Sequence, residues 1–200
     1  MVAAREAPAR PVKDVWIVTG IPGAGKSTVS RRLAKRYPRG VHLEGDLIGG
    51  YTGHFIVSGL VPPPLEPDPE GHRQLNLSVR NQSLLARSFS DAGFLTVVDN
   101  VVVTRERLGQ YRSALRRLNV HFVVLNPGLE AALERDRLRE EKTVGDVWAP
   151  LERLMIDELS GIGLWVDSRA MTADQTVDFI LRRERRAFLP RGPLKPRRPR

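Results

Sequence analysis

The sequence predicts an α/β fold, a three-layer α/β/α sandwich around a five-stranded parallel sheet. Apolar, strand-like segments alternate along the chain with segments of helical pattern, which is the order that a doubly wound sheet requires. The length of 200 residues suits one domain of ordinary size, and no internal repeat or linker divides it. Right-handed crossovers between these strands place helices on both faces of the sheet and give the three layers.

Five short segments have the composition of strands. The first, DVWIVTG, is apolar enough to be buried, and the third, FLTVVDN, is β-branched and closed by an acid. The predicted strands are residues 14–20, 41–45, 94–100, 120–126 and 164–168.

The helices are delimited by capping residues and by proline and glycine. Pro38 and Gly40 end the first helix, and Thr104 caps a later one. The predicted helices are residues 27–37, 68 to about 91, 104 to about 118, a charged segment after Pro127, roughly 147–160, and 172–186. Three regions follow from these boundaries: an N-terminal arm (1–13), a domain (14–186) and a basic, proline-rich tail (187–200).

The positive charge of the chain is concentrated at its end. The formal net charge is +9, and residues 182–200 hold nine basic residues and one acid, which leaves the rest nearly neutral. This composition is typical of a solvated extension. Nucleic-acid binding by residues 182–200 is possible but is not the interpretation that we favour. The chain has no cysteine, which excludes disulfides and thiolate chemistry. Without an apolar leader or membrane span, we expect a cytoplasmic protein.

A phosphate-binding loop follows the first predicted strand. Residues 20–28 read GIPGAGKST and satisfy the pattern G-x-x-x-x-G-K-[ST] between a strand and a helix. Glycines let backbone N–H groups face an anion at a helix N-terminus, Lys26 would reach the β and γ phosphates, and Ser27 would ligate Mg²⁺. The predicted nucleotide-binding residues are Gly20, Ile21, Pro22, Gly23, Ala24, Gly25, Lys26, Ser27 and Thr28.

A second metal-binding residue is predicted at the end of the third strand. Asp99 follows a buried apolar run, the form in which an acid is delivered to the Mg²⁺ shell. The third strand should lie beside the first, which would place Asp99 next to Ser27. The chain lacks an NKxD-type segment that reads guanine, so a GTPase switch is not favoured.

Four features in order resemble the small P-loop kinases, the group of gluconate, shikimate, chloramphenicol and polynucleotide kinases and zeta toxins. They are the loop GIPGAGKST, Asp46 in VHLEGDLIGG, Asp99, and the segment ALERDRLREEK. The resemblance implies the strand order 2-3-1-4-5 of the P-loop kinase type. It further implies that Asp46 is the general base for the acceptor hydroxyl, although Glu44 competes for this role. It also implies that Arg135 and Arg139, four residues apart on one helix face, begin a lid over about residues 135–146 and act on the transferring phosphate.

The acceptor pocket is expected in residues 47–80, a long segment after the proposed base. Its candidate contacts are Tyr51, Phe55, Arg73 and Arg80. The segment departs from known patterns, because no gluconate-kinase lid signature is found and no arginine directly follows Asp46. The acceptor and the oligomeric state therefore stay open.

The predicted function is Mg²⁺-dependent transfer of the ATP γ-phosphate to a hydroxyl of a small metabolite or antibiotic, with Asp46, Lys26, Arg135 and Arg139 in catalysis. Two alternatives remain: a polynucleotide 5′-hydroxyl kinase that uses the basic tail, and a nucleotide-dependent switch or sensor.

Overall fold

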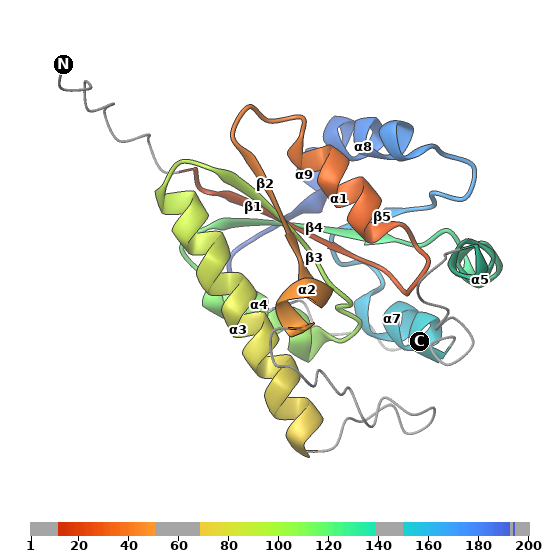
Figure 1. The fold of residues 1–200 in the computed structure, drawn as a ribbon, viewed down its shortest axis with the longest axis horizontal. Helices are drawn as coiled ribbons and strands as arrows, with labels where there is room; N and C mark the ends of the chain where they lie inside the picture. Colours follow the sequence, from red (N-terminus) through yellow and green to blue (C-terminus); the bar gives the residue numbers. More distant parts are fainter. Residues whose placement is uncertain (1–11, 51–68, 139–149, 193, 195–200) are drawn as a thin grey trace.

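A parallel sheet forms the centre of the molecule (Figure 1). The computed structural model describes residues 12–50, 69–138, 150–192 and 194. Within these ranges the main strand order is β2-β3-β1-β4-β5, as predicted. The strands are β1 (Asp14–Thr19), β2 (Gly40–Glu44), β3 (Leu95–Asp99), β4 (Asn119–Leu125), β5 (Leu164–Val166) and β6 (Phe188–Leu189).

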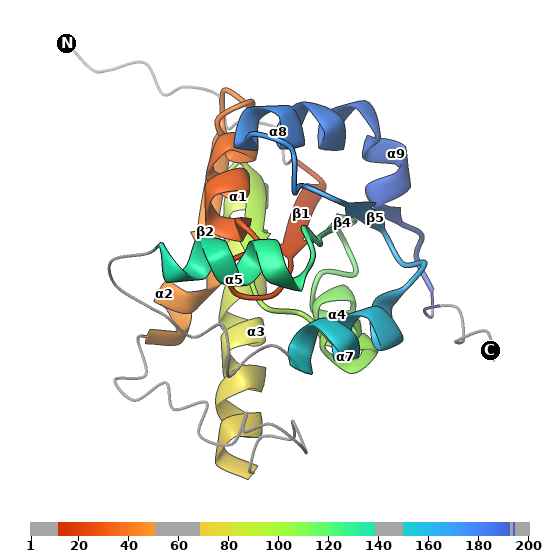
Figure 2. The same cartoon turned by 90° about the vertical axis from the view of Figure 1, so that its right-hand side faces the viewer.

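Helices cover both faces of the sheet, which gives the predicted three layers. Helices α1 and α8 pack against each other on one face, and α3 and α4 pack on the other (Figures 1 and 2). An ion pair of 2.6 Å between Arg36 and Asp178 joins the first pair. The helices are α1 (Lys26–Ala34), α2 (Gly45–Gly50), α3 (Pro69–Asp91), α4 (Arg105–Ala114), α5 (Leu129–Arg137), α7 (Pro150–Leu159), α8 (Ala173–Arg182) and α9 (Glu184–Ala187).

The sheet register brings three strand ends together at one edge. Asp99 at the end of β3 is aligned with Val18 of β1 and with Glu44 of β2. The central strand β1 is fully buried from Val15 to Val18, because helices lie on both of its faces. The carboxyl ends of β1, β2 and β3 therefore meet where α1 and α2 begin.

The C-terminal part of the fold differs from the prediction of one helix over 172–186. Helix α8 ends at Arg182, because Arg183 leaves the helical conformation with φ −119° and ψ 21°. The turn there allows Ala187 and Leu189 to be buried, and β6 pairs antiparallel with β4 through Leu189 and Val120. Burial of these apolar side chains explains why the helix does not continue to residue 186.

Helix α2, like β6, is an element that the sequence did not predict. It starts directly after β2 and places Asp46 in its first turn. Across the described ranges, none of the helices combines the length and the apolar character that crossing a membrane requires.

Candidate nucleotide and phosphoryl-transfer site

The loop between β1 and α1 has the shape that its sequence predicts. The N–H of Ala24 donates to the carbonyl of Ile21 at 3.1 Å, and Nζ of Lys26 donates to the same carbonyl at 3.1 Å. Gly25 lies directly before α1 with φ 91°, and no side chain caps the helix. The N-terminus of α1 therefore has no side-chain cap among the described residues, which leaves backbone N–H groups for a ligand.

Two glycines in the loop serve different purposes. A Cβ at Gly23 would lie 2.0 Å from the carbonyl oxygen of Ala132 in α5, so only glycine allows this close approach. A Cβ at Gly25 would meet no atom within 4 Å. The space next to Gly25, at an uncapped helix N-terminus, fits a phosphate group.

The Asp99 carboxylate is held by groups from three other segments. Its Oδ2 lies 3.1 Å from Nε2 of His42 in β2, and its Oδ1 accepts the N–H of Gly45 at 3.1 Å. The Ser27 hydroxyl lies near enough to this carboxylate, which is only 3% exposed, to lower its pKa. Asp99 and the serine of the loop are therefore candidate ligands of one Mg²⁺ ion.

These contacts keep Asp99 ionised. Burial by itself raises the pKa of the carboxyl, because a low-dielectric interior disfavours the charge. The hydrogen bonds from His42 and Gly45, together with the nearby Ser27 hydroxyl, favour the charged form more strongly, so the pKa of Asp99 lies below its ordinary value. An ionised carboxylate next to a hydroxyl is a donor set that Mg²⁺ accepts.

Asp46 and Glu44 lie close together in the chain but in different settings. Asp46 is exposed in the first turn of α2, one residue after the Gly45 that binds Asp99. Glu44 is still part of β2, and its carboxylate lies 4.0 Å from Arg31. Of the two acids, Asp46 is the one without a cationic partner among the described residues.

Of the two predicted lid arginines, Arg135 is described by the structure and Arg139 is not. Arg135 donates from Nη2 to the carbonyls of Ser168 at 3.0 Å and Arg169 at 3.2 Å, in the connection between β5 and α8. In this structure it binds neighbouring backbone, a role that its helical spacing did not predict. Arg139 and most of the proposed lid lie outside the described residues.

The predicted acceptor contacts are described only in part. Arg73 forms an ion pair of 2.6 Å with Glu70 on α3, where both side chains are exposed. Arg80 is exposed further along the same helix. Tyr51 and Phe55 lie outside the described residues, as does most of the acceptor segment.

A buried polar chain beside Asp99 was missed by sequence reasoning. Asn100 donates from Nδ2 to the Tyr111 hydroxyl at 2.8 Å, and this hydroxyl donates to Gln82 of α3. Burial raises the pKa of Tyr111 above its ordinary value, so its hydroxyl stays protonated. A polar residue directly after the acid of the third strand was the available signal for Asn100, whereas nothing local marked His42.

Comparison with known proteins agrees with this geometry. A family model described as an AAA domain (AAA_33) matches residues 15–155, and no curated protein matches the chain. A crystal structure of a sugar kinase from Janibacter sp. HTCC2649 is similar at 20% identity with a TM-score of 0.62, and covers 88% of this chain and 96% of its own.

Two further structures have similar folds. A gluconokinase from Sinorhizobium meliloti 1021 shares 19% identity with a TM-score of 0.61, over 84% of this chain and 90% of its own. A Deinococcus radiodurans tunicamycin resistance protein shares 22% identity with a TM-score of 0.59, over 90% and 99%. The predicted resemblance is confirmed at the level of the fold, and the chain belongs to the AAA domain family, with the fold of the small P-loop kinases.

Proposed function

We propose that this protein is a Mg²⁺-dependent kinase that transfers the γ-phosphate of ATP to a hydroxyl of a small molecule. The observation that carries this proposal is the joint placement of Ser27, Asp99 and Asp46. The first two lie near each other, and Asp46 follows the residue whose N–H binds Asp99. Two candidate metal ligands and an acid without a cationic partner among the described residues thus lie at one edge of the sheet, which supports phosphoryl transfer.

The donor half of the site would be built by the loop and by α1. Backbone N–H groups of residues 20–28 would hold the phosphates, Lys26 would bind their β and γ oxygens, and Ser27 and Asp99 would hold Mg²⁺. Bound Mg·ATP supplies the phosphoryl group and the cation that neutralises its charge. The protein's own contribution is to orient these groups before reaction.

The acceptor half would be built around Asp46. Its exposed carboxylate can accept the proton of a hydroxyl and turn the oxygen toward the donor phosphate. Glu44 is less suited, because it lies within β2 near Arg31. We extend the proposal to an acceptor pocket over residues 47–80, with Tyr51, Phe55, Arg73 and Arg80 as contacts, and to a lid over residues 135–146 that includes Arg139.

The acceptor class is proposed from the fold and from composition. The structures of similar fold are named for a sugar kinase, a gluconokinase and tunicamycin resistance, and residues 47–80 mix aromatic and apolar residues with few charges. This mixture suits a neutral hydroxyl compound, either a metabolite or an antibiotic.

The test is a phosphoryl-transfer screen over sugars, nucleosides, hydroxylated antibiotics and a 5′-hydroxyl oligonucleotide, read by mass spectrometry of the product. With the best acceptor, Asp46→Asn should lower kcat by about 100-fold or more, the range of general-base catalysis, and leave ATP affinity unchanged. Asp91→Asn, an exposed aspartate at the end of α3, is the matched control.

Two outcomes would contradict the proposal. Near-normal transfer by Asp46→Asn would remove Asp46 from the reaction. A screen without any phosphorylated product, together with a protein partner that binds only in the presence of ATP, would favour a nucleotide-dependent switch.

A further inference from the structure

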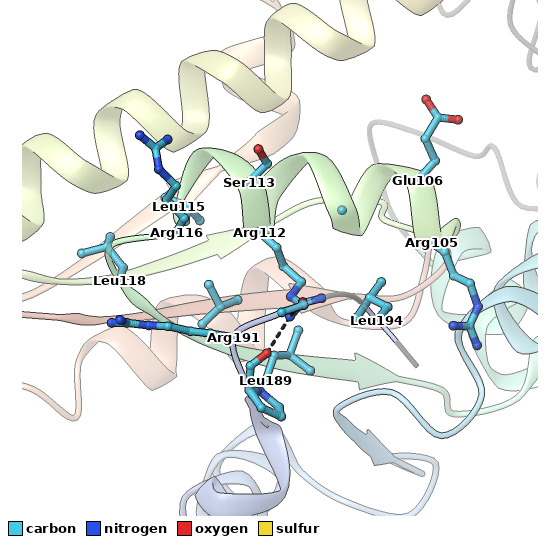
Figure 3. Close-up of a pocket in the computed structure, with 14 residues that line it drawn as sticks. Arg105, Glu106, Arg112, Ser113, Leu115, Arg116, Leu118, Leu189, Arg191 and Leu194 are labelled. Atoms are coloured by element: carbon cyan, nitrogen blue, oxygen red, sulfur yellow. Dashed lines mark hydrogen bonds between the residues drawn. The ribbon is translucent and has the colours of Figure 1, made fainter. Parts of the chain in front are cut away.

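We propose a second ligand site, for a small organic anion with an apolar body, in the groove between α4 and residues 189–192 and 194. The groove has a volume of ≈ 690 Å³ (Figure 3). This value lies within the roughly 300–1,000 Å³ that small-molecule sites occupy. No residue of the nucleotide loop and none of the groups that hold Asp99 line it, so the site is separate from the proposed kinase centre.

The inner surface of the groove is apolar. Its side chains come from the end of α4, from β4 and from the C-terminal segment: Leu115, Leu118, Val120, Leu189 and Leu194. The first four are buried, and Leu194 packs against the core. A ligand body placed here would gain the free energy of apolar burial, roughly 25 cal/mol per Å².

Cations without acidic partners lie at the same groove. Arg112 donates to the carbonyls of Pro190 and Gly192 and so ties the C-terminal segment to α4, while Arg191 lies below the helix in Figure 3. Within the described ranges neither guanidinium pairs with a carboxylate. The acid among the lining residues, Glu106, points away from Arg112 on the other side of α4 (Figure 3).

This arrangement decides the charge of the ligand. Burial lowers the pKa of Arg112, because a partly desolvated guanidinium loses some of the stabilisation of its charge. Among the described residues no carboxylate compensates this charge. A carboxylate, sulfonate or phosphate on the ligand would supply the missing counter-charge, and arginine binds such planar or tetrahedral anions in defined geometry.

The position of Gly109 is an independent argument that the groove is open. This residue lies inside α4, where glycine is less favourable than alanine. A Cβ at this position would meet no atom within 4 Å, so packing does not require glycine here. Gly109 lines the groove, so a side chain longer than a methyl group is expected to project into it. The absence of a long side chain at this position leaves the groove accessible.

The test measures binding of 8-anilinonaphthalene-1-sulfonate, an apolar fluorophore with one anionic group, to the full chain without nucleotide. Decanoate should displace the probe. Decanol should need a concentration at least about tenfold higher for the same displacement, a factor that corresponds to about 1.4 kcal/mol. Absence of nucleotide makes the result independent of kinase activity.

Two pairs of variants locate the probe. Gly109→Trp should fill the groove and abolish binding, while Gly109→Ala should retain binding and stabilise α4. Arg191→Glu should weaken binding about tenfold or more through lost charge pairing. Arg185→Glu makes the same charge change on exposed α9, outside the groove, and should bind as the wild type does. Circular dichroism confirms that each variant is folded.

The proposal is overturned if folded Gly109→Trp and Arg191→Glu bind the probe like the wild type, or if decanol displaces it as well as decanoate. It is also overturned if sedimentation shows a dimer of the wild type that Gly109→Trp dissociates, because the groove would then be an interface between copies of the chain.

Discussion

Nε2 of His42 lies 3.1 Å from Oδ2 of Asp99, and both side chains are nearly buried at the end of the central sheet. Because an ionised carboxylate only accepts hydrogen bonds, His42 must donate its Nε2 proton to Asp99. This contact fixes the rotation of the carboxylate, so that its other oxygen accepts the N–H of Gly45. His42 is thus a positioning residue for the proposed metal site.

Replacement of this histidine should weaken metal binding without removing the loop. In His42→Leu we expect the Mg²⁺ concentration for half-maximal ATP binding to rise about tenfold. Loss of a residue that orients a metal ligand weakens metal binding by about 10- to 100-fold, and we expect the lower end of this range. The measurement is a Mg²⁺ titration of ATP binding by calorimetry. His72→Leu, on the exposed face of α3, is the matched control. Equal Mg²⁺ dependence in both variants would show that His42 does not position Asp99.

Gly23 should tolerate substitution worse than a glycine of the same backbone conformation. Gly23 and Gly161 both have φ 79°, but only at Gly23 would a Cβ collide with backbone, 2.0 Å from the oxygen of Ala132. Gly161→Ala should cost about 1–2 kcal/mol for the left-handed conformation. Gly23→Ala should cost a further 1–3 kcal/mol, roughly, because α5 must move. Urea unfolding of both variants checks the difference, and equal losses would contradict the close approach of α5.

Ionisation of Tyr111 should lower the free energy of unfolding at alkaline pH. Its folded-state pKa is raised by burial, so its contribution is complete below the unfolded-state value near 10 and is lost as the pH rises toward the folded-state value. Tyr111→Phe cannot ionise. At pH 7 it should lose about 1–3 kcal/mol, because Gln82 and Asn100 lose a buried partner.

The pH dependence distinguishes this effect from a simple loss of packing. Urea unfolding at pH 7 and pH 11 should show that the difference between wild type and Tyr111→Phe becomes smaller at the higher pH. A difference that is constant between the two pH values would mean that Tyr111 does not titrate as a buried phenol.

Arg135 should act on the connection between β5 and α8. Arg135→Ala removes the hydrogen bonds to the carbonyls of Ser168 and Arg169, so amide hydrogen exchange over residues 168–172 should become faster. Arg117→Ala, an exposed arginine after α4, should leave this exchange unchanged. Unchanged exchange in Arg135→Ala together with a large loss of kcat would favour the lid role that the sequence predicts.

Much of the fold could be predicted because its signals are local. The phosphate loop is a continuous segment between a strand and a helix, and its glycines specify the backbone whatever the rest of the chain does. The alternation of apolar segments with helices indicates a parallel sheet with helices on both faces, because crossovers in parallel sheets have one hand. The strand order was expected from the resemblance to the small P-loop kinases, and the structure has this order. The order in turn places the end of β3 beside β1, so the proximity of Asp99 to Ser27 follows from topology.

Other parts of the site depend on contacts between residues far apart in the chain. His42 and Gly45 lie more than 50 residues from Asp99, and only the register of β2 with β3 brings them to its carboxylate. The spacing of Arg135 shows which face of α5 it occupies but not that the carbonyls of Ser168 and Arg169 are within its reach.

The sequence by itself determined a nucleotide loop, a parallel α/β sheet and the acids at two strand ends, because short segments encode backbone conformation and burial. The tertiary structure alone decided how Asp99 is held, where α8 ends, and that residues 189–192 and 194 line a groove against α4. These features result from competition among many distant apolar and polar contacts, where burial of Ala187 and Leu189 outweighs the local preference of a basic segment for helix or coil.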